Sequence, residues 1–519
     1  MTTNSKLSRI LKFSCLNRFK CVVGKSALCL LIGLSTFGLL SNAAFAQIFG
    51  NFTYVSDGSA VTITGYSVPA NGPVLIPGTI DGLPVTAIGI GAFQNNVTLT
   101  QVSIPNSVVR ISQFAFSGCS TLNSVNIPDG VTSIARSTFE FCPALTQVTI
   151  PSNVTAIGTN AFKNCTALTS LTIPGKVSLI GIGAFANCAG LTSLTFLPPP
   201  PGHTAFLTTI NSGTFSSCSS LTSLVLPSTI TVIGNFAFQY CEGLTSLAIP
   251  ASVTSIGPDF VFDSCSRLSS IIVHPNNPTF STIDGFLTNK LQTTLITCPA
   301  GKSGTVTIPS TITAINPSAF LNCSKIVSVV FPQSVTDVGS KAFSTCSQLR
   351  RAIFLGDSPS NFITDAFEFA ASGFTVYFYE GAAGFTSPTW NGYPAASMGA
   401  NVVTPYNTWL LSHGLPANQN WQYDDNGDGV GNLMAFALGL NPNQNLSGAM
   451  PKPIFSSTQM SLSFYSGAPG VTYSVESCTD FTDWSADEVV LSQPDANQIR
   501  TATVMTSGLN RFMRLKVNP

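Results

Sequence analysis

The most regular feature of the chain is a hydrophobic pattern that returns every 23 residues. Each copy opens with Ile-Pro, continues through polar residues to Val-Thr-x-Ile-Gly, and ends with Ala-Phe-x-x-Cys-x-x-Leu. Ile104, Ile127, Ile150 and Ile173 open four consecutive copies. A fixed period of this length predicts a solenoid, in which each unit buries its apolar side only by stacking on its neighbours.

Within each unit, the residues up to the Ile-Pro pair alternate between apolar and small polar types, as in 168–173. This alternation predicts a short strand with one buried face. Pro174 ends strand pairing because it has no N–H to donate. A second apolar stretch, 177–180, ends at Gly181, a residue suited to a tight corner. The Phe that follows, Phe185 in this unit, is expected to point inward and fill the interior.

The repeat Phe continues along the chain with few departures in spacing. A proline-rich insertion at 197–202 lengthens one step to 30 residues, two steps are 24, and a step of 58 contains an atypical unit, Val273 to Pro309. The repeat phenylalanines are Phe93, Phe116, Phe139, Phe162, Phe185, Phe215, Phe238, Phe262, Phe320, Phe343 and Phe367.

These units resemble the BspA-type leucine-rich repeat of bacterial surface proteins. The clearest copy runs from Ile150 to Leu168, and the opening segments 63–66 and 80–89 are similar to the first unit of that family. Segments 281–287 and 298–302 resemble its longer variant repeat. The resemblance implies a right-handed, mainly β leucine-rich-repeat solenoid of short parallel strands, used for adhesion or protein binding.

Nine cysteines follow the repeat phenylalanines by three residues. In an exported chain they could form disulfides. However, residues in register in neighbouring units would lie about 5 Å apart and point the same way, whereas a disulfide needs converging Cβ atoms about 3.8 Å apart. Such a column also cannot surround a metal ion tetrahedrally. We therefore expect buried free thiols that fill space at Cys119, Cys142, Cys165, Cys188, Cys218, Cys241, Cys265, Cys323 and Cys346.

The predicted strands also have polar positions that should face solvent. A Ser/Thr surface of this kind can bind glycans, proteins or ice, or can be simply a solvated sheet face. One column contains Asn126, Thr149, Thr172 and Thr195, and the other contains Ser124, Gln147, Ser170, Ser193, Ser223 and Ser246.

Beyond the repeats, a short helix is predicted over 405–413 and a second over 433–438. The loop between them resembles the calcium loop of EF-hand and dockerin proteins, and oxygen ligands at its positions 1, 3, 5, 7 and 9 suit Ca²⁺. The expected ligands of this structural ion are the side chains of Asp424, Asn426, Asp428 and Asn432 and the carbonyl of Val430.

One position departs from that pattern, because Ala435 stands at position 12, where a bidentate carboxylate is expected. Its absence should weaken the affinity for calcium. An acidic, Gly-rich turn without an ion is the alternative.

The remaining C-terminal residues predict two further features. The aromatic, Gly- and Pro-rich segment 375–394 indicates a capping unit, and alternating stretches at 461–464, 471–475 and 512–517 indicate a small antiparallel β domain. The expected organisation is a signal peptide at 1–46, a solenoid with its caps at 47–398, a helix-loop-helix at 399–446 and the β domain at 447–519.

The predicted signal peptide rests on three observations. Basic residues between Lys6 and Lys25 precede an apolar run at 27–40, and Ala44-Phe45-Ala46 has the small-x-small pattern of a cleavage site, which would make Gln47 the mature N-terminus. An uncleaved anchor is the alternative, although the run is short and interrupted by polar residues. No second run is long enough to span a bilayer, so we expect a mature chain without a membrane span that is secreted or at the cell surface.

Charge and motif content bear on function. Charged residues make up 8% of the chain and the formal net charge is zero, which gives no electrostatic basis for nucleic-acid binding. The sequence has no nucleophile elbow and no recurring carboxylate pair. We therefore expect a protein that is not an enzyme but a binding or adhesion scaffold for a protein or glycan ligand. The alternatives are a structural envelope or matrix component and a solenoid polysaccharide-active enzyme using Arg350; the oligomeric state is left open.

Overall fold

The computed structural model describes residues 46–67, 72–402, 404–420, 422–424, 426–456, 458–479, 483–506 and 511–518. The described residues belong to one unit of the chain. Except for Ala46, the predicted signal peptide lies outside the described residues. No helix among the residues described is both long and apolar enough to cross a membrane.

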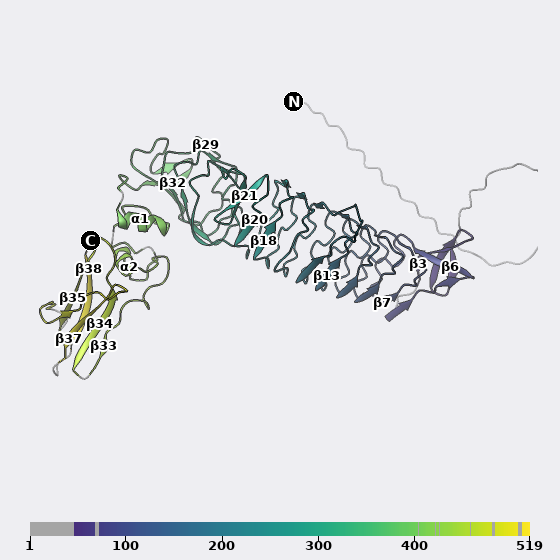
Figure 1. Cartoon of the computed structure of the whole chain (residues 1–519), viewed down its shortest axis with the longest axis horizontal. Helices are drawn as coiled ribbons and strands as arrows, with labels where there is room; N and C mark the ends of the chain where they lie inside the picture. Colours follow the sequence, from purple (N-terminus) through teal and green to yellow (C-terminus); the bar gives the residue numbers. More distant parts are fainter. Residues whose placement is uncertain are drawn as a thin grey trace, which may run out of the picture. The chain divides into compact units, whose positions relative to one another are not determined.

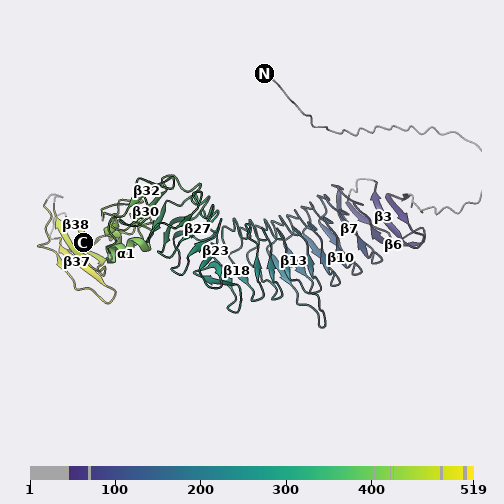
Figure 2. The ribbon, with the colours of Figure 1, turned by 90° about the horizontal axis from the view of Figure 1, so that it is seen from above.

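This unit contains a mainly β solenoid whose turns lie side by side in chain order (Figures 1 and 2). Each regular turn has one longer strand, one two-residue strand, and a tight segment that contains the repeat Phe. Parallel pairing joins equivalent residues of successive turns, as at Ile134 with Ile157 and Val125 with Val148. The fold class predicted from the 23-residue period is confirmed.

The longer strands present one surface, which we call the strand face. They pair in parallel within four groups, and the alternation of their residues buries one side of each strand. These strands are β4 (Gly72–Leu75), β7 (Leu99–Ser103), β9 (Ser124–Asn126) and β11 (Gln147–Thr149); β13 (Ser170–Ile173) and β15 (Ser193–Phe196); β18 (Ser246–Ile249) and β20 (Ser270–Val273); and β24 (Gly304–Thr307), β26 (Ile326–Phe331), β28 (Arg351–Phe354), β30 (Thr375–Phe378) and β32 (Tyr393–Ser397).

The short strands form a second surface of the solenoid. Each has two residues. In most of them, one residue is exposed or half-buried and the other is a buried aliphatic residue that packs in the interior. They are β8 (Arg110–Ile111), β10 (Ser133–Ile134), β12 (Ala156–Ile157), β14 (Leu179–Ile180), β16 (Thr209–Ile210), β17 (Val232–Ile233), β19 (Ser255–Ile256), β25 (Ala314–Ile315), β27 (Asp337–Val338) and β29 (Asn361–Phe362).

Irregular strands mark the beginning, middle and end of the solenoid. Antiparallel pairing at the start covers an edge that would otherwise be unpaired. These strands are β1 (Gln47–Phe49), β2 (Phe52–Ser56), β3 (Val61–Tyr66), β5 (Thr79–Ile80) and β6 (Leu83–Ile88) at the start; β21 (Phe280–Ile283), β22 (Phe286–Asn289) and β23 (Thr294–Thr297) in the atypical unit; and β31 (Thr389–Trp390) at the end.

The repeat phenylalanines fill the interior, as predicted. The Phe139 N–H donates to the Ala161 carbonyl at 2.8 Å, and the Phe162 N–H donates to the Ala184 carbonyl at 2.8 Å. The ladder places each ring over the next, and from Tyr66 to Phe262 the centroids of successive rings lie 5.1 to 5.9 Å apart. Offset aromatic pairs at such distances add stability beyond that of area burial.

The repeat cysteines are free and buried, which confirms the prediction. The structure adds a role as hydrogen-bond donors. The Cys142 thiol donates to the Phe116 carbonyl at 3.1 Å, and the Cys165 thiol donates to the Phe139 carbonyl at 3.2 Å. The Phe116 carbonyl also accepts the Cys119 N–H at 3.2 Å, so the thiol adds a second hydrogen bond to a buried carbonyl. Burial raises the pKa of the Cys119 thiol to about 12.

The C-terminal region contains two helices and an antiparallel β module. Helix α1 (Pro405–Ser412) begins where the Thr404 hydroxyl accepts the Asn407 N–H at 3.0 Å, and Pro405 suits its first position. Helix α2 (Asn432–Ala437) starts one residue before the predicted boundary. The module contains β33 (Ile454–Phe455), β34 (Gln459–Tyr465), β35 (Thr472–Cys478), β36 (Val490–Leu491), β37 (Ile499–Met505) and β38 (Phe512–Asn518). The exact domain boundaries stay predictions.

The stacked column generates a stability prediction. Phe162→Ala should lower the free energy of unfolding by about 3–5 kcal/mol, because it removes a fully buried ring and leaves a cavity. Phe141→Ala is the matched control, since Phe141 is 54% exposed, and its effect should stay within about 0.5 kcal/mol. Chemical denaturation followed by circular dichroism measures both. Equal losses in the two variants would contradict the inward column.

The cysteine column predicts thiols that react only after unfolding. The thiolate is the nucleophile, and burial keeps the pKa of Cys165 well above its ordinary value. Mass spectrometry after alkylation at pH 8 should find the solenoid cysteines unmodified in the native chain and modified in guanidinium chloride. Thr172→Cys, at an exposed position, should react in the native state. Thiols that stay unmodified after unfolding would indicate disulfides instead.

Candidate functional site

The predicted polar columns lie on the strand face. Thr149 pairs in register with Asn126, and Thr195 pairs with Thr172. All four side chains are exposed, because the residues that alternate with them, such as Leu171, are buried in the core. The same period of two places the Ser124 and Ser170 column toward solvent.

One predicted column member lies outside the strand ladder. Ser223 is exposed, but residues 221–227 form no strand. The proline-rich insertion at 197–202 separates β15 from this turn in the sequence, and within the described ranges β15 pairs with β13 alone. The column is therefore interrupted at Ser223 and resumes at Ser246 in β18.

The polar part of the strand face is hollowed. Residues of β4, β7, β9 and β11 line a hollow of about 450 Å³ that includes Gln101, Asn126 and Thr149. A second hollow of about 480 Å³ includes Ser170 and Thr172, and Asp129 is the one charged residue in its lining. Hydroxyl and amide groups therefore supply most of the hydrogen-bonding capacity of these surfaces.

Farther along the solenoid, the same column becomes apolar. Val225 is 82% exposed and Ile272 is 56% exposed. Ile272 pairs in register with Ala248, which is also exposed. The change from polar to apolar residues in this column was not predicted above, although Val225 and Ile272 occupy the same repeat position as Thr172.

In the last turns, a segment of the chain itself covers the strand face. Thr305 donates its hydroxyl to the His413 carbonyl at 2.7 Å, and Ser328 donates to the Gly414 carbonyl at 2.9 Å. Gly414 has φ of +72°, and a Cβ there would lie 2.4 Å from the Ser328 Cβ. Only a residue without a side chain allows this approach.

An apolar cluster completes that contact. Val330 pairs in register with Ile353, and Ile353 pairs with Tyr377, in the column that contains Thr172 in earlier turns. Val330 and Ile353 are buried in one cluster with Ala417, and Leu411 packs against it. The strand face is therefore able to bind a chain segment through hydroxyl groups in one column and apolar groups in the next.

The predicted calcium loop brings three of its side chains together. Asp424 accepts the N–H groups of Gly427 and Gly429 at 2.8 and 2.7 Å. The Asn426 side chain donates to the Asp428 carboxylate at 3.2 Å. Backbone N–H groups of Leu446 and Val430 lower the pKa of Asp428, opposed by desolvation.

The other two predicted ligands lie at the start of α2. Val430 is half-buried, and its N–H donates to the Asp428 carboxylate at 2.8 Å. Asn432 is buried, and its side chain donates to Gln419 at 3.1 Å. Two carboxylates, two amides and a carbonyl form an oxygen donor set suited to Ca²⁺. Ala435 is fully buried in α2 and supplies no ligand.

A comparison with known families identifies the repeats. The sequence model described as BspA type Leucine rich repeat region matches residues 86–199, 204–302 and 300–380, in six copies. The chain belongs to this family. The matched residues of this BspA-type repeat protein include most of the strand face, whereas the calcium loop and the β module lie beyond them.

Solved structures provide a further comparison. A leucine rich cell surface protein from Faecalibacterium prausnitzii A2-165 is 24% identical, with 73% of this chain and 99% of that chain covered and a TM-score of 0.47. A leucine-rich repeat protein from Bacteroides ovatus is 23% identical, with coverage of 65% and 100% and a TM-score of 0.39. The T. pallidum leucine rich repeat protein is 32% identical, with coverage of 42% and 88% and a TM-score of 0.33. No curated protein matches this BspA-type repeat protein.

Proposed function

We propose that this protein is a secreted or cell-surface binding scaffold without catalytic activity, and that its strand face holds a protein or glycan ligand. The observation that carries the proposal is the packing of residues 411–417 against the last turns, with Gly414 and Ala417 buried. The columns that make this contact occupy the same repeat positions as columns that are exposed in the earlier turns, although the strand ladder between them is divided into groups.

The composition of the face indicates how a ligand would be held. Hydroxyl and amide groups around Thr149 and Thr172 suit hydrogen bonding to sugar hydroxyls or to a peptide backbone. Val225 and Ile272 provide apolar area that a ligand could bury. Because the face is nearly uncharged, we expect an affinity that depends little on salt.

We extend the proposal to a structural Ca²⁺ ion in the loop at 424–432. The ion would be held by Asp424, Asn426, Asp428, Asn432 and the Val430 carbonyl, and it would fix the loop between α1 and α2. Support comes from the convergence of Asp424, Asn426 and Asp428 within one turn.

The strand face can be tested by charge introduction. The probe is an array of immobilised glycans and extracellular-matrix proteins, to which the labelled full chain is applied. Thr149→Glu, Thr172→Glu and Thr195→Glu together should reduce binding at least about tenfold, because buried unpaired carboxylates at an interface are costly.

The matched control is the pair Thr132→Glu and Thr155→Glu, two exposed threonines outside the longer strands. These variants should bind as the original chain does. Loss of binding in both sets, or no binding of the original chain anywhere on the array, would contradict the proposed role.

Calcium binding can be tested by titration calorimetry and thermal unfolding. Because position 12 lacks a carboxylate, we expect a dissociation constant at the weak end for such loops, about 10⁻⁴–10⁻³ M. Saturating Ca²⁺ should raise the melting temperature by mass action, and Asp424→Asn should abolish both effects. Asp57→Asn is the control, since Asp57 also accepts loop N–H groups but lies in an N-terminal turn. A Ca²⁺ response that survives Asp424→Asn would contradict the site.

A further inference from the structure

The column of stacked rings is interrupted at one place. Among the described residues, ring contacts run without a gap from Tyr66 to Phe262, stop there, and begin again where Phe286 meets Phe320. The gap lies in the atypical unit, in the 58-residue step between Phe262 and Phe320.

Cys298 occupies the position of the missing ring. Its N–H donates to the Ala319 carbonyl at 2.7 Å, as the Phe139 N–H donates to the Ala161 carbonyl in a regular turn. The Cys298 carbonyl accepts the Cys323 thiol at 3.8 Å, just as the Phe116 carbonyl accepts the Cys142 thiol in a regular turn. The backbone register is therefore kept, while a small side chain replaces a large aromatic one.

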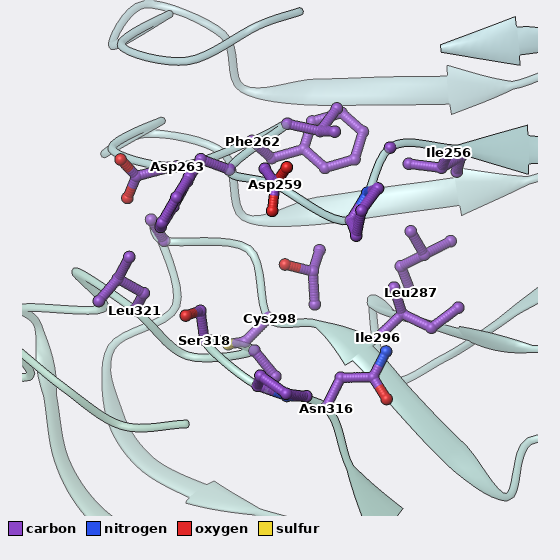
Figure 3. Close-up of a pocket in the computed structure, with 18 of the residues that line it drawn as sticks. Ile256, Asp259, Phe262, Asp263, Leu287, Ile296, Cys298, Asn316, Ser318 and Leu321 are labelled. Carbon is purple, nitrogen blue, oxygen red and sulfur yellow. The ribbon is translucent and has the colours of Figure 1, made fainter. Parts of the chain in front are cut away.

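A cavity of about 490 Å³ lies at this gap (Figure 3). Figure 3 shows Phe262 on one side, Cys298 on the other, and Leu287 and Ile296 at one end. A dry apolar cavity of about 150 Å³ is enough to bind benzene. The space therefore exceeds what a single aromatic ring requires.

The backbone ladder is also open at the cavity. In the preceding turn the Phe238 N–H donates to the Val261 carbonyl at 3.0 Å, but the Phe262 N–H has no acceptor among the described residues. The flanking residue Phe260 has φ of +51°, close to the +57° of its equivalent Phe236, so the local conformation is retained. Phe262 is buried and lines the cavity, and an N–H that kept the direction of its equivalent at Phe238 would point along the solenoid toward it.

The polar rim of the cavity is acidic. Asp259 and Asp263 line it, and no Lys, Arg or His of the described part of the chain belongs to the lining. The Asp263 carboxylate accepts amide N–H groups from Gln239 and Asn322, whereas the Asp259 carboxylate accepts a side-chain donor only from Asn235. Neither carboxylate has an ion-pair partner in the part of the chain that the structure describes, so an ammonium group at the rim would be attracted.

We propose that this cavity is a binding site for a small aromatic molecule that carries an ammonium group and a carbonyl oxygen, the combination present in the amide of an aromatic amino acid. Its ring takes the place of the ring missing at Cys298. Its carbonyl accepts the Phe262 N–H, and its ammonium group lies beside Asp259. The site is separate from the strand face and does not depend on the function proposed for it.

The probe is phenylalaninamide, titrated into the full chain by calorimetry. Three related compounds separate the contributions: alaninamide lacks the ring, N-acetylphenylalaninamide lacks the charge, and phenethylamine lacks the carbonyl. Each should bind at least tenfold more weakly than phenylalaninamide. Cys298→Phe should abolish binding because it fills the gap, while Cys298→Ala, which also removes the thiol, should leave binding within threefold.

A second variant does not depend on repacking the interior. Asp259 is exposed, so Asp259→Asn should fold normally. It should weaken phenylalaninamide about tenfold and leave N-acetylphenylalaninamide unchanged. No binding of phenylalaninamide to the original chain at millimolar concentration would overturn the proposal. Unchanged binding to a folded Cys298→Phe chain, or equal losses for both compounds in Asp259→Asn, would overturn it as well.

Discussion

The interaction on which the rest of the structure depends is the hydrogen bond from the N–H of the repeat Phe to the following turn, which the regular turns share. It sets the distance between turns, and that distance brings consecutive rings within stacking contact. Neither part suffices alone, because a short segment without the rings would expose its backbone to water, and rings without the ladder would have no fixed register. The thiol three residues after the repeat Phe donates to the carbonyl of the repeat Phe one turn earlier.

In this arrangement, the longer strands contribute only every second residue to the buried interior. Their outward positions are consequently available for recognition, and their residue types vary along the solenoid while the buried positions stay apolar. The last turns illustrate the consequence, since residues 411–417 lie on the same columns that remain exposed at Thr172 and Ile272. In a solenoid of this kind, the residues that stabilise the fold and the residues available for recognition are therefore more clearly separated than in a globular domain.

Much of the architecture could be predicted from the sequence because the repeat carries its own register. Once Phe162 and Cys165 were aligned with their equivalents, their inward direction, the free thiols and the exposed Thr column followed from the period alone. That Cys298 stands at the position of the repeat Phe could not be found in this way, because the spacing in the atypical unit differs from that of the regular repeats and the unit cannot be aligned with them. The contact of Gly414 with Ser328 is also invisible in the sequence, because it joins segments 86 residues apart. The predicted calcium ligands converge in part, but ion binding itself depends on a ligand shell that no residue pattern fully specifies, and it stays a prediction.

The most direct test of the account is hydrogen exchange of the backbone amides, resolved to single turns. The account predicts slow exchange at Phe116, Phe139 and Phe162, whose N–H groups donate to the next turn. It predicts markedly faster exchange at Phe262, which is equally part of the repeat but finds no acceptor among the residues that the structure describes. Equal exchange at all four residues would contradict the claim that the inter-turn ladder holds the solenoid together and is open at one place.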